Sequence, residues 1–284
     1  MPVIKIYSPD GGHIAAAVMG AMAVGRPEAA PGVARSKAEK TRRKNPSRLT
    51  VAQHVLPRRS LERFVGADGR VDLNDLIRKA SRRAKPGDSL FCAQRAWDQR
   101  AETGYMKEIE DRFQVLADAL TDGLSTIASP ADRIAVCRFF ALWYMRARHR
   151  DLADQEVRLG GITGDNLTKE QEETLEVKGY AFARTGGLMP ARQLNGLWLQ
   201  RQIDGYAEDL AKATRWGVIR PQSGKFIVTD MPLHTILPVT PTLALISETD
   251  DGIITRDNLA EINRSIIAGS QRYYLAQDLA DCPR

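Results

Sequence analysis

Apolar residues recur every three or four positions over long parts of the chain, and this spacing predicts amphipathic helices. The pattern is clearest in four segments, Glu102–Leu124, Ala131–Arg150, Ala191–Thr214 and Arg256–Ala276. The second of these segments is apolar nearly all round until Arg146, which is typical of a helix buried on every side. We therefore expect Ala131–Arg150 to be the central helix of the fold.

Short apolar runs between turn-forming residues predict a smaller β component. Trp216–Ile219 and Phe226–Thr229 flank a turn at Pro221–Gly224, and two such runs joined by a turn are typical of a β-hairpin. A further run, Leu243–Ile246, follows a loop that contains two prolines. The pattern therefore predicts an α+β fold, a mostly helical single domain with a small antiparallel β-sheet or hairpin.

One polar segment also predicts a helix, because it carries a start signal. Thr168 and Gln171 have the spacing of a capping box, in which each side chain bonds the other residue's backbone amide. The segment that they begin, Thr168–Glu176, reads TKEQEETLE and is acidic. We expect it to be a solvated surface helix.

Near the N-terminus, the run Ile14–Gly25 is apolar and rich in small residues. It is similar to the hydrophobic part of a secretory signal, but Asp10 and His13 interrupt its approach and Lys5 is the one basic side chain before it. We favour a short helix packed on the body of the protein or on a partner. No run in the sequence reaches the roughly 20 apolar residues that span a bilayer, so we expect no membrane partner.

The net charge of +6 equals the excess in one segment, Arg35–Arg48, which has seven basic residues and one acidic residue, Glu39. Such a segment has little apolar surface to bury. We therefore expect residues 1–48 to be a basic, partly disordered arm and residues 49–284 to be the α+β domain. This composition fits a phosphate-backbone binder and a solubilising tail about equally well. The candidate nucleic-acid-binding residues are Arg35, Lys37, Lys40, Arg42, Arg43, Lys44 and Arg48.

Composition sets the broad class of the protein. Apolar residues make up 43% of the chain, which is enough for a sizeable core. The three cysteines, Cys92, Cys137 and Cys282, are far apart and form no CxxC pair. An odd number of separated cysteines argues against a disulfide framework and against a structural zinc site. We therefore expect a reducing compartment, the cytoplasm.

Four side chains form the candidate catalytic set: His54, Glu102, Glu110 and Asp230. A general base or a divalent metal site needs carboxylates and imidazole that converge from separate elements. Glu102 and Glu110 are near enough in helical angle to share a broad face, and Asp230 follows a predicted buried strand. With Mg²⁺ or Mn²⁺ bound by Asp230 and Glu110, the set could activate water against a phosphodiester.

Three of these residues also have a structural interpretation, which we favour over the catalytic one. Glu110 would pair with Arg133 or Arg138 of a neighbouring helix. Asp230 would accept hydrogen bonds from the loop after it, and His54 would be a turn residue bonded to the backbone.

Four pieces of the sequence resemble a known family in their order along the chain. They are QHVLPRRSLERF from Gln53, RAETGYMKEIEDRF from Arg100, KFIVTDMPL from Lys225 with the later LPVTPTLAL, and INRSIIAGSQRYYLAQ from Ile262. Together they resemble the bacterial domain-of-unknown-function 4238 family over about Thr50–Gln277. No activity is established for that family, so the resemblance implies no reaction. This chain has Met231 where the family pattern has an asparagine, so no side-chain amide is implied there.

Two functions fit these observations. The first is a nucleic-acid-directed, metal-dependent hydrolase, similar to a nuclease, that uses the candidate catalytic set. The second is a non-enzymatic protein whose basic arm binds nucleic acid or an acidic protein, with the basic cluster Arg78–Lys85 as another place for the contact. Convergence of the four side chains in one cleft would favour the enzyme. Their scatter, together with a continuous basic face, would favour the binding protein.

Overall fold

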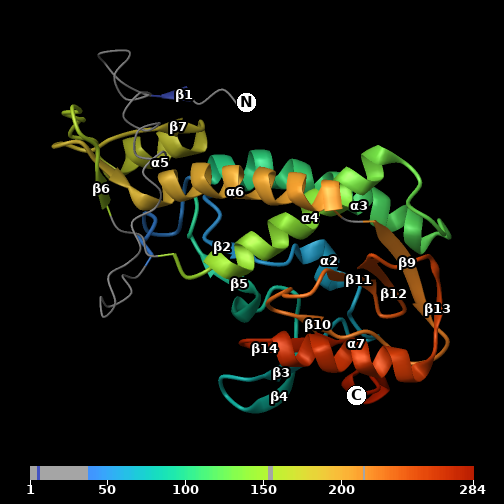
Figure 1. The fold of residues 1–284 in the computed structure, drawn as a ribbon. Coiled ribbons are helices and arrows are strands. Elements are labelled where there is room, and N and C mark those ends of the chain that lie inside the picture. Colours follow the sequence, from blue (N-terminus) through green and yellow to red (C-terminus); the bar gives the residue numbers. More distant parts are fainter. Residues whose placement is uncertain (1–4, 7–37, 153–155, 214) are drawn as a thin grey trace. The chain divides into compact units, whose positions relative to one another are not determined.

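The computed structural model describes residues 5–6, 38–152, 156–213 and 215–284 (Figure 1). The described residues form six α-helices, with 41% helix and 21% strand, so the α+β prediction is confirmed but the fold is mixed rather than mostly helical. None of the helices in this described part is long and apolar enough to cross a membrane. The expectations for Ile14–Gly25, Arg35 and Lys37 fall outside the described residues.

The chain divides into two compact units, so the predicted single domain is corrected. Each unit is built from three segments that alternate along the sequence. Unit 1 comprises residues 1–53, 93–108 and 149–202. Unit 2 comprises residues 54–92, 109–148 and 203–284. The first change from one unit to the other therefore follows Gln53, inside the predicted main domain.

Unit 1 combines helical segments with two-stranded sheets. β1 (Lys5–Ile6) pairs in parallel with β7 (Tyr180–Ala181). β6 (Glu156–Arg158) pairs antiparallel with β8 (Leu188–Pro190). The helical elements of unit 1 are the π-helix η2 (Ala101–Met106), α5 (Lys169–Val177) and the first part of α6 (Ala191–Ala213).

Helix α5 begins at the predicted capping box. The Thr168 hydroxyl accepts a hydrogen bond from the Gln171 amide, and the Gln171 side chain accepts one from the Thr168 amide at 2.8 Å. The expectation of a solvated helix is wrong, because Glu172, Glu173 and Glu176 are all buried. Carboxylates are rarely buried without paired cations. The burial of one acidic face therefore points to basic partners inside unit 1.

Unit 2 contains two four-stranded sheets and most of the long helices. The first sheet has the order β10-β14-β3-β4 and consists of β3 (Val71–Asp75), β4 (Ala80–Ala84), β10 (Val228–Thr229) and β14 (Tyr273–Ala276). The second has the order β11-β12-β9-β13 and consists of β9 (Trp216–Pro221), β11 (Ile236–Thr240), β12 (Leu243–Ser247) and β13 (Gly252–Ile254). All of α2 (Arg58–Glu62) and α7 (Arg256–Gly269), and most of α3 (Lys107–Thr121) and α4 (Pro130–His149), belong to this unit.

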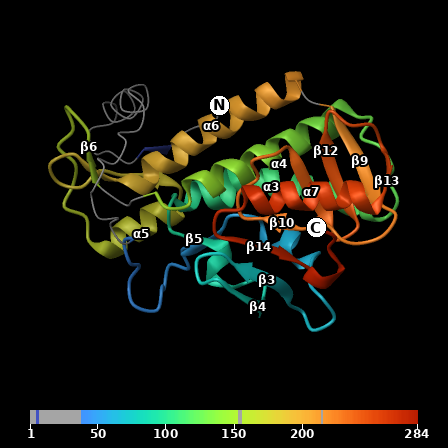
Figure 2. The same ribbon diagram turned by 60° about the horizontal axis from the view of Figure 1, so that its bottom comes forward.

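Four short elements complete the description. β2 (Ala52–His54) pairs with β5 (Cys92–Gln94), and two 3₁₀ turns occur at Ser89–Phe91 and Leu279–Asp281. Figure 2 shows β3 and β4 beside β14, with α7 running alongside this sheet.

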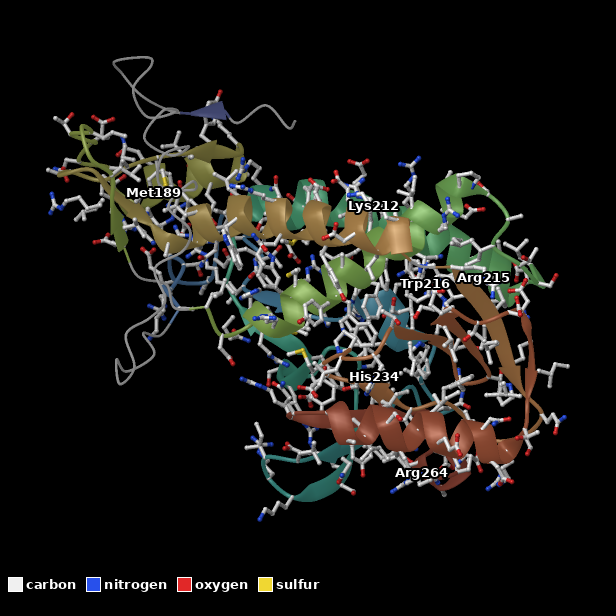
Figure 3. All side chains as sticks on the ribbon, in the orientation of Figure 1. Met189, Lys212, Arg215, Trp216, His234 and Arg264 are labelled. Atoms are coloured by element: carbon white, nitrogen blue, oxygen red, sulfur yellow. The ribbon has the colours of Figure 1, made fainter. Side chains whose placement is uncertain are left out.

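Helix α4 is buried along most of its length, as the hydrophobic pattern predicts. The ring of Phe139 stacks on that of Phe113 in α3, with centroids 3.8 Å apart. On another side, the ring centroid of Phe140 lies 5.7 Å from that of Trp216, the first residue of β9. Trp216 is labelled in Figure 3. Large aromatic surfaces of this kind supply much of the hydrophobic stabilisation of a core. The core of unit 2 therefore forms around α4.

Two predictions about secondary structure are wrong. The strands β9 and β10, expected to form a hairpin, lie in different sheets: β9 pairs with β12 and β13, while β10 pairs with β14. The predicted helix Arg256–Ala276 also ends early. Its last part, Tyr273–Ala276, is strand β14, whose aromatic residues are strand formers.

Candidate functional site

The candidate Asp230 lies at the end of a buried strand, as predicted, and is itself only 3% exposed. Its carboxylate accepts hydrogen bonds from two backbone amides, Gln271 at 2.8 Å and Arg272 at 3.1 Å. These amides come from the segment between α7 and β14 rather than from the loop after Asp230. The structural interpretation is thus supported with different partners: the carboxylate fixes the point where the chain leaves the helix and enters the strand.

Asp230→Asn is expected to lower the free energy of unfolding by about 1–3 kcal/mol, because an amide offers one acceptor oxygen where the carboxylate offers two charged ones. Urea denaturation measures this change, and the surface variant Asp209→Asn is the control, since Asp209 is 78% exposed. We expect Mn²⁺ to leave the melting temperature unchanged in both the parent and Asp230→Asn. If Mn²⁺ raised the melting temperature of the parent but not that of Asp230→Asn, Asp230 would instead be identified as a metal ligand.

Glu110 and His54 approach each other in unit 2 through a buried arginine. Arg146 Nη1 donates to Glu110 Oε1 at 2.5 Å and to the His54 carbonyl oxygen at 3.1 Å. The His54 ring does not take part, because its Nε2 lies 3.0 Å from the carbonyl oxygen of Pro86. The expected partner of Glu110, Arg133 or Arg138, is therefore corrected to Arg146, another arginine of α4. Backbone bonding of His54 is confirmed.

Glu102 belongs to unit 1, whereas the other three candidates belong to unit 2. It lies in the π-helix η2 and accepts a hydrogen bond from Trp97 Nε1 at 2.6 Å. A π-helix has a different angular spacing from an α-helix, so the helix face predicted for Glu102 and Glu110 does not follow from their separation. Among the residues that the structure describes, no group of three or more His, Cys, Asp or Glu side chains could hold a metal ion. The Mg²⁺ or Mn²⁺ site at Asp230 and Glu110 gains no support from this arrangement.

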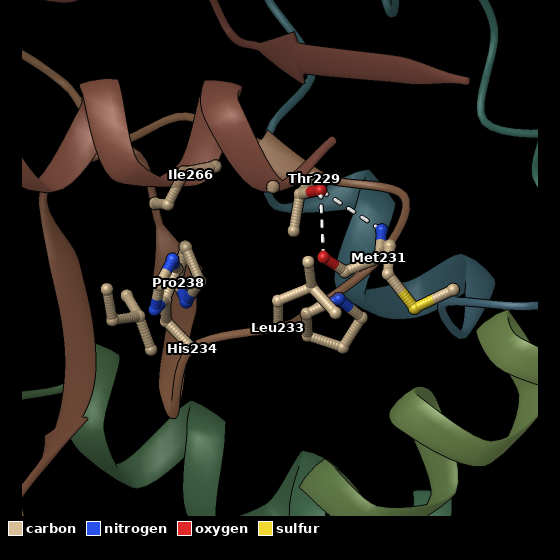
Figure 4. Close-up of a pocket in the computed structure, with 9 residues that line it drawn as sticks. Thr229, Met231, Leu233, His234, Pro238 and Ile266 are labelled. Carbon is tan, nitrogen blue, oxygen red and sulfur yellow. Dashed lines mark hydrogen bonds between the residues drawn. The ribbon is translucent and has the colours of Figure 1, made fainter. Parts of the chain in front are cut away.

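The space beside the Asp230 loop is small and mostly apolar (Figure 4). Its volume is about 10 Å³, room for about one water molecule, and Leu233, His234 and Ile266 are among its lining residues. Thr229 closes one side through two hydrogen bonds with the backbone of Met231. A cavity of this size has no room for a nucleotide or another substrate of similar size.

The described end of the predicted arm, residues 38–48, is part of unit 1 and is fixed to helix α5. Arg42 pairs with Glu173 at 3.1 Å and with Glu170 at 3.0 Å, and its amide donates to Glu173 as well. These contacts attach residues 38–48 to α5, and the expectation of a separable arm over residues 1–48 stays a prediction. Four of the predicted nucleic-acid contacts have exposed side chains here: Lys40, Arg43, Lys44 and Arg48.

Glu39, the one acidic residue of the basic segment, lies among three cations of unit 1. Its carboxylate pairs with Arg184 at 2.7 Å, with Arg192 at 2.5 Å and with Lys169. Burial alone would raise the pKa of this carboxyl. The surrounding positive charges outweigh burial and lower the pKa to about 2.

The lowered pKa predicts how unit 1 responds to acid. Because the folded pKa lies below the ordinary value, ionised Glu39 stabilises the fold above about pH 5, and this contribution is lost as the pH falls towards about 2. Glu39→Gln should therefore lower the free energy of unfolding by about 2 kcal/mol at neutral pH and flatten its decline in acid. Urea titrations over this pH range measure both effects, with the exposed Glu108→Gln as control. If the free energy of unfolding depended on pH in the same way in the parent and in Glu39→Gln, the lowered pKa of Glu39 would be contradicted.

A basic cleft lies in unit 2, where the start of α2, the turn before β3, strand β4 and the loop after β4 meet. Its volume is about 700 Å³, and none of its lining residues is aromatic. Its basic lining residues are Arg58, Arg70, Arg82, Arg83 and Lys85, against the acidic Glu62 and Asp88. The lining therefore carries a net positive charge.

Three of these cations are held in place by carboxylates. Arg82 makes two hydrogen bonds to Asp88, at 2.7 and 3.1 Å, and this bonding raises the pKa of Arg82 and lowers that of Asp88. Arg83 pairs with Asp72 at 2.9 Å. Arg58 pairs with Glu62 at 2.9 Å. Such pairs fix side-chain directions on the walls of the cleft.

The other two cations, Arg70 and Lys85, have exposed side chains. Within the described part of the chain, no carboxylate lies within 4.0 Å of either of them. They flank the first pair of the β3–β4 ladder, in which Val71 lies opposite Ala84. The hairpin thus brings two uncompensated positive charges to the mouth of one cleft.

Part of this cleft follows from the sequence, which has a basic cluster at Arg78–Lys85. Arg58 and Arg70 join it only through folding. Arg70 comes to lie beside Lys85 because Val71 pairs with Ala84 at the start of the β3–β4 ladder. Nothing in the spacing of Arg58 indicates that it belongs to the same cleft.

Comparison with protein-family models, with curated proteins and with solved structures found no match to this chain. The resemblance to the domain-of-unknown-function 4238 family therefore stays a prediction.

Proposed function

We propose that this chain is a nucleic-acid-binding protein that holds the phosphate backbone in the basic cleft of unit 2. The observation that carries the proposal is the pair Arg70 and Lys85, which bring positive charge to the cleft without a described carboxylate to neutralise it. Neutralised phosphates release their bound counterions, and this release drives binding of a basic surface to nucleic acid.

A binding function has more support than hydrolysis. None of His54, Glu102, Glu110 and Asp230 lines the cleft. The His54 ring faces a backbone carbonyl, and the three carboxylates accept hydrogen bonds from an indole, a guanidinium and backbone amides. A general base needs a free lone pair directed at the substrate. The metal-dependent hydrolase therefore has no support in the contacts of these side chains.

The exposed cations of unit 1 are candidates for a second contact. Lys40, Arg43, Lys44 and Arg48 have exposed side chains in a segment that Glu39 and Arg42 hold in place. A fixed row of cations binds phosphates with a smaller loss of conformational entropy than a disordered tail. Contact between this segment and nucleic acid remains a prediction.

The salt dependence of binding tests the proposal. The logarithm of the binding constant for a short fluorescent duplex should fall linearly with the logarithm of the salt concentration. The double variant Arg70→Ala/Lys85→Ala should reduce this slope by about 2, because each lost phosphate contact contributes about 0.9. Fluorescence anisotropy over a range of KCl concentrations measures the slope.

The matched control is Arg256→Ala/Arg264→Ala, which removes the same charge from the exposed face of α7 in the same unit. We expect this control to keep the slope of the parent. Equal slopes for the parent and the Arg70/Lys85 variant would remove the cleft from the proposal. A parent without salt-dependent binding would overturn the proposal itself.

A further inference from the structure

The tip of the β3–β4 hairpin displays an apolar side chain next to two cations. Ile77 is 63% exposed, and it is followed by Arg78 and Lys79, which are also exposed. A single exposed apolar residue is ordinary on a protein surface. The position of Ile77 is informative because this hairpin also carries the two cations at the mouth of the basic cleft.

The turn that holds Ile77 is preformed. The buried carboxylate of Asp75 accepts hydrogen bonds from the amides of Ile77, at 3.1 Å, and Arg78, at 2.9 Å. The amide of Leu76 donates to the carbonyl of Arg272 at 2.8 Å, and the Leu76 side chain packs against the hydrophobic core under α7. The loop is therefore fixed from both sides, and binding would not have to order it.

Charge lies at both ends of this hairpin. Arg70 and Lys85 are at its open end, and Arg78 and Lys79 are at its tip. With five-residue strands that rise about 3.4 Å per residue, the two ends are roughly 17 Å apart. Because β3 is also paired with β14, the hairpin forms the edge of a four-stranded sheet. Strands of β-sheet proteins contact DNA through the major or the minor groove, and cations at both ends of this edge can reach phosphates along the groove wall.

We infer, on the basis of the proposed function, that the ligand is double-stranded DNA and that Ile77 inserts between two base pairs. Apolar side chains inserted in this way partly unstack the step and kink the duplex, while neighbouring cations hold the phosphates. Single-stranded nucleic acid is disfavoured, because such ligands stack on aromatic side chains and the lining of the cleft has none. A flat lipid surface would reach Ile77 but not the concave cleft.

Bending of labelled DNA tests the inference. A duplex with a donor dye at one end and an acceptor dye at the other should show increased energy transfer when the parent protein binds, because a kink shortens the end-to-end distance. Ile77→Ser should lose most of this increase and keep the salt slope of the parent, since the phosphate contacts remain. The control is Ile253→Ser, which changes an isoleucine of β13 that is 71% exposed in the same unit. The control should bend the duplex as the parent does.

The outcomes separate this inference from the proposed function. A steep salt slope without bending, or full bending by Ile77→Ser, would overturn the inserted wedge and leave the phosphate-binding cleft in place. Absence of salt-dependent duplex binding by the parent would overturn both. Equal affinity for a single strand of the same length would refute the duplex ligand. Binding to phosphatidylserine vesicles that Ile77→Ser abolishes, without bending of DNA by the parent, would assign the tip to a membrane surface.

Discussion

Glu176→Gln is expected to lower the free energy of unfolding by about 3–5 kcal/mol, the range for breaking a buried ion pair by removal of one partner. Glu176 Oε2 accepts hydrogen bonds from Arg95 Nη2 at 2.7 Å and from Arg192 Nη2 at 3.0 Å. Both guanidinium groups have side chains that are only 1% exposed. Glutamine keeps the shape of the side chain but takes the paired carboxylate from buried Arg95 and leaves Arg192 with Glu39 as its anionic partner.

The measurement is urea denaturation, together with hydrogen exchange to locate the loss. Protection should fall in α5 and in the first part of α6, which carry Glu176 and Arg192. The control is Glu170→Gln on the same helix, because the Glu170 side chain is 71% exposed and its pair with Arg42 should contribute less than about 1 kcal/mol. A change below 1 kcal/mol for Glu176→Gln would show that other groups compensate the charges of Arg95 and Arg192.

Gly164→Ala is expected to cost at least about 3 kcal/mol, because it combines backbone strain with overlap against another backbone segment. Gly164 has a φ of +67°, a conformation that L-residues rarely adopt. A Cβ at this position would lie 2.0 Å from the carbonyl oxygen of Arg184. Arg184 bridges the carboxylates of Glu39 and Glu172, so displacement of its backbone would also disturb the buried ion network of unit 1.

The control for this prediction is Gly160→Ala, four residues earlier in the same loop. A Cβ on Gly160 would meet nothing within 4 Å, and its φ is not in the left-handed region. We expect Gly160→Ala to change the free energy of unfolding by less than about 1 kcal/mol. If both variants unfolded at the same urea concentration, the close approach of Gly164 to Arg184 would have no energetic weight.

Local patterns in the sequence predicted the features that depend on local physics. The apolar spacing of Ala131–Arg150 identified the buried helix α4, and the capping box at Thr168 identified the start of α5. Both signals act within a few residues, so no knowledge of distant partners is needed. The carboxylate of Asp230 at a strand end was predicted on the same basis.

The failures concern features that depend on partners far away in the sequence. The strand β10 pairs with β14, where Val228 lies opposite Leu275, and nothing in either run specifies that choice over the nearby β9. The acidic face of α5 is polar by any local measure and is nevertheless buried, because cations from other segments neutralise it. Glu39 was counted only as a charge within a basic segment, and its partners Arg184 and Arg192 lie far along the chain.

The basic cleft was likewise predictable from the sequence only in part. The basic cluster of β4 and its flanks is consecutive in sequence and was predicted as an alternative contact for nucleic acid, whereas the contribution of Arg58 required the fold. The contacts of the candidate catalytic set give it no support, for a comparable reason. It assumed that Glu102 and Glu110 share one α-helical face, and the π-helix at Ala101–Met106 removes the regular spacing on which that assumption depends.

The alternation of segments between the two units sets the order in which the chain can fold during synthesis. Unit 1 lacks its third segment until residue 202 has been made, and by then two of the three segments of unit 2 have already left the ribosome. Glu39 emerges 153 residues before Arg192. Contacts of such long range form slowly, because closing the intervening loop costs entropy before any contact is gained. The nascent chain therefore carries incomplete cores and uncompensated charges over a long interval, in which aggregation competes with folding.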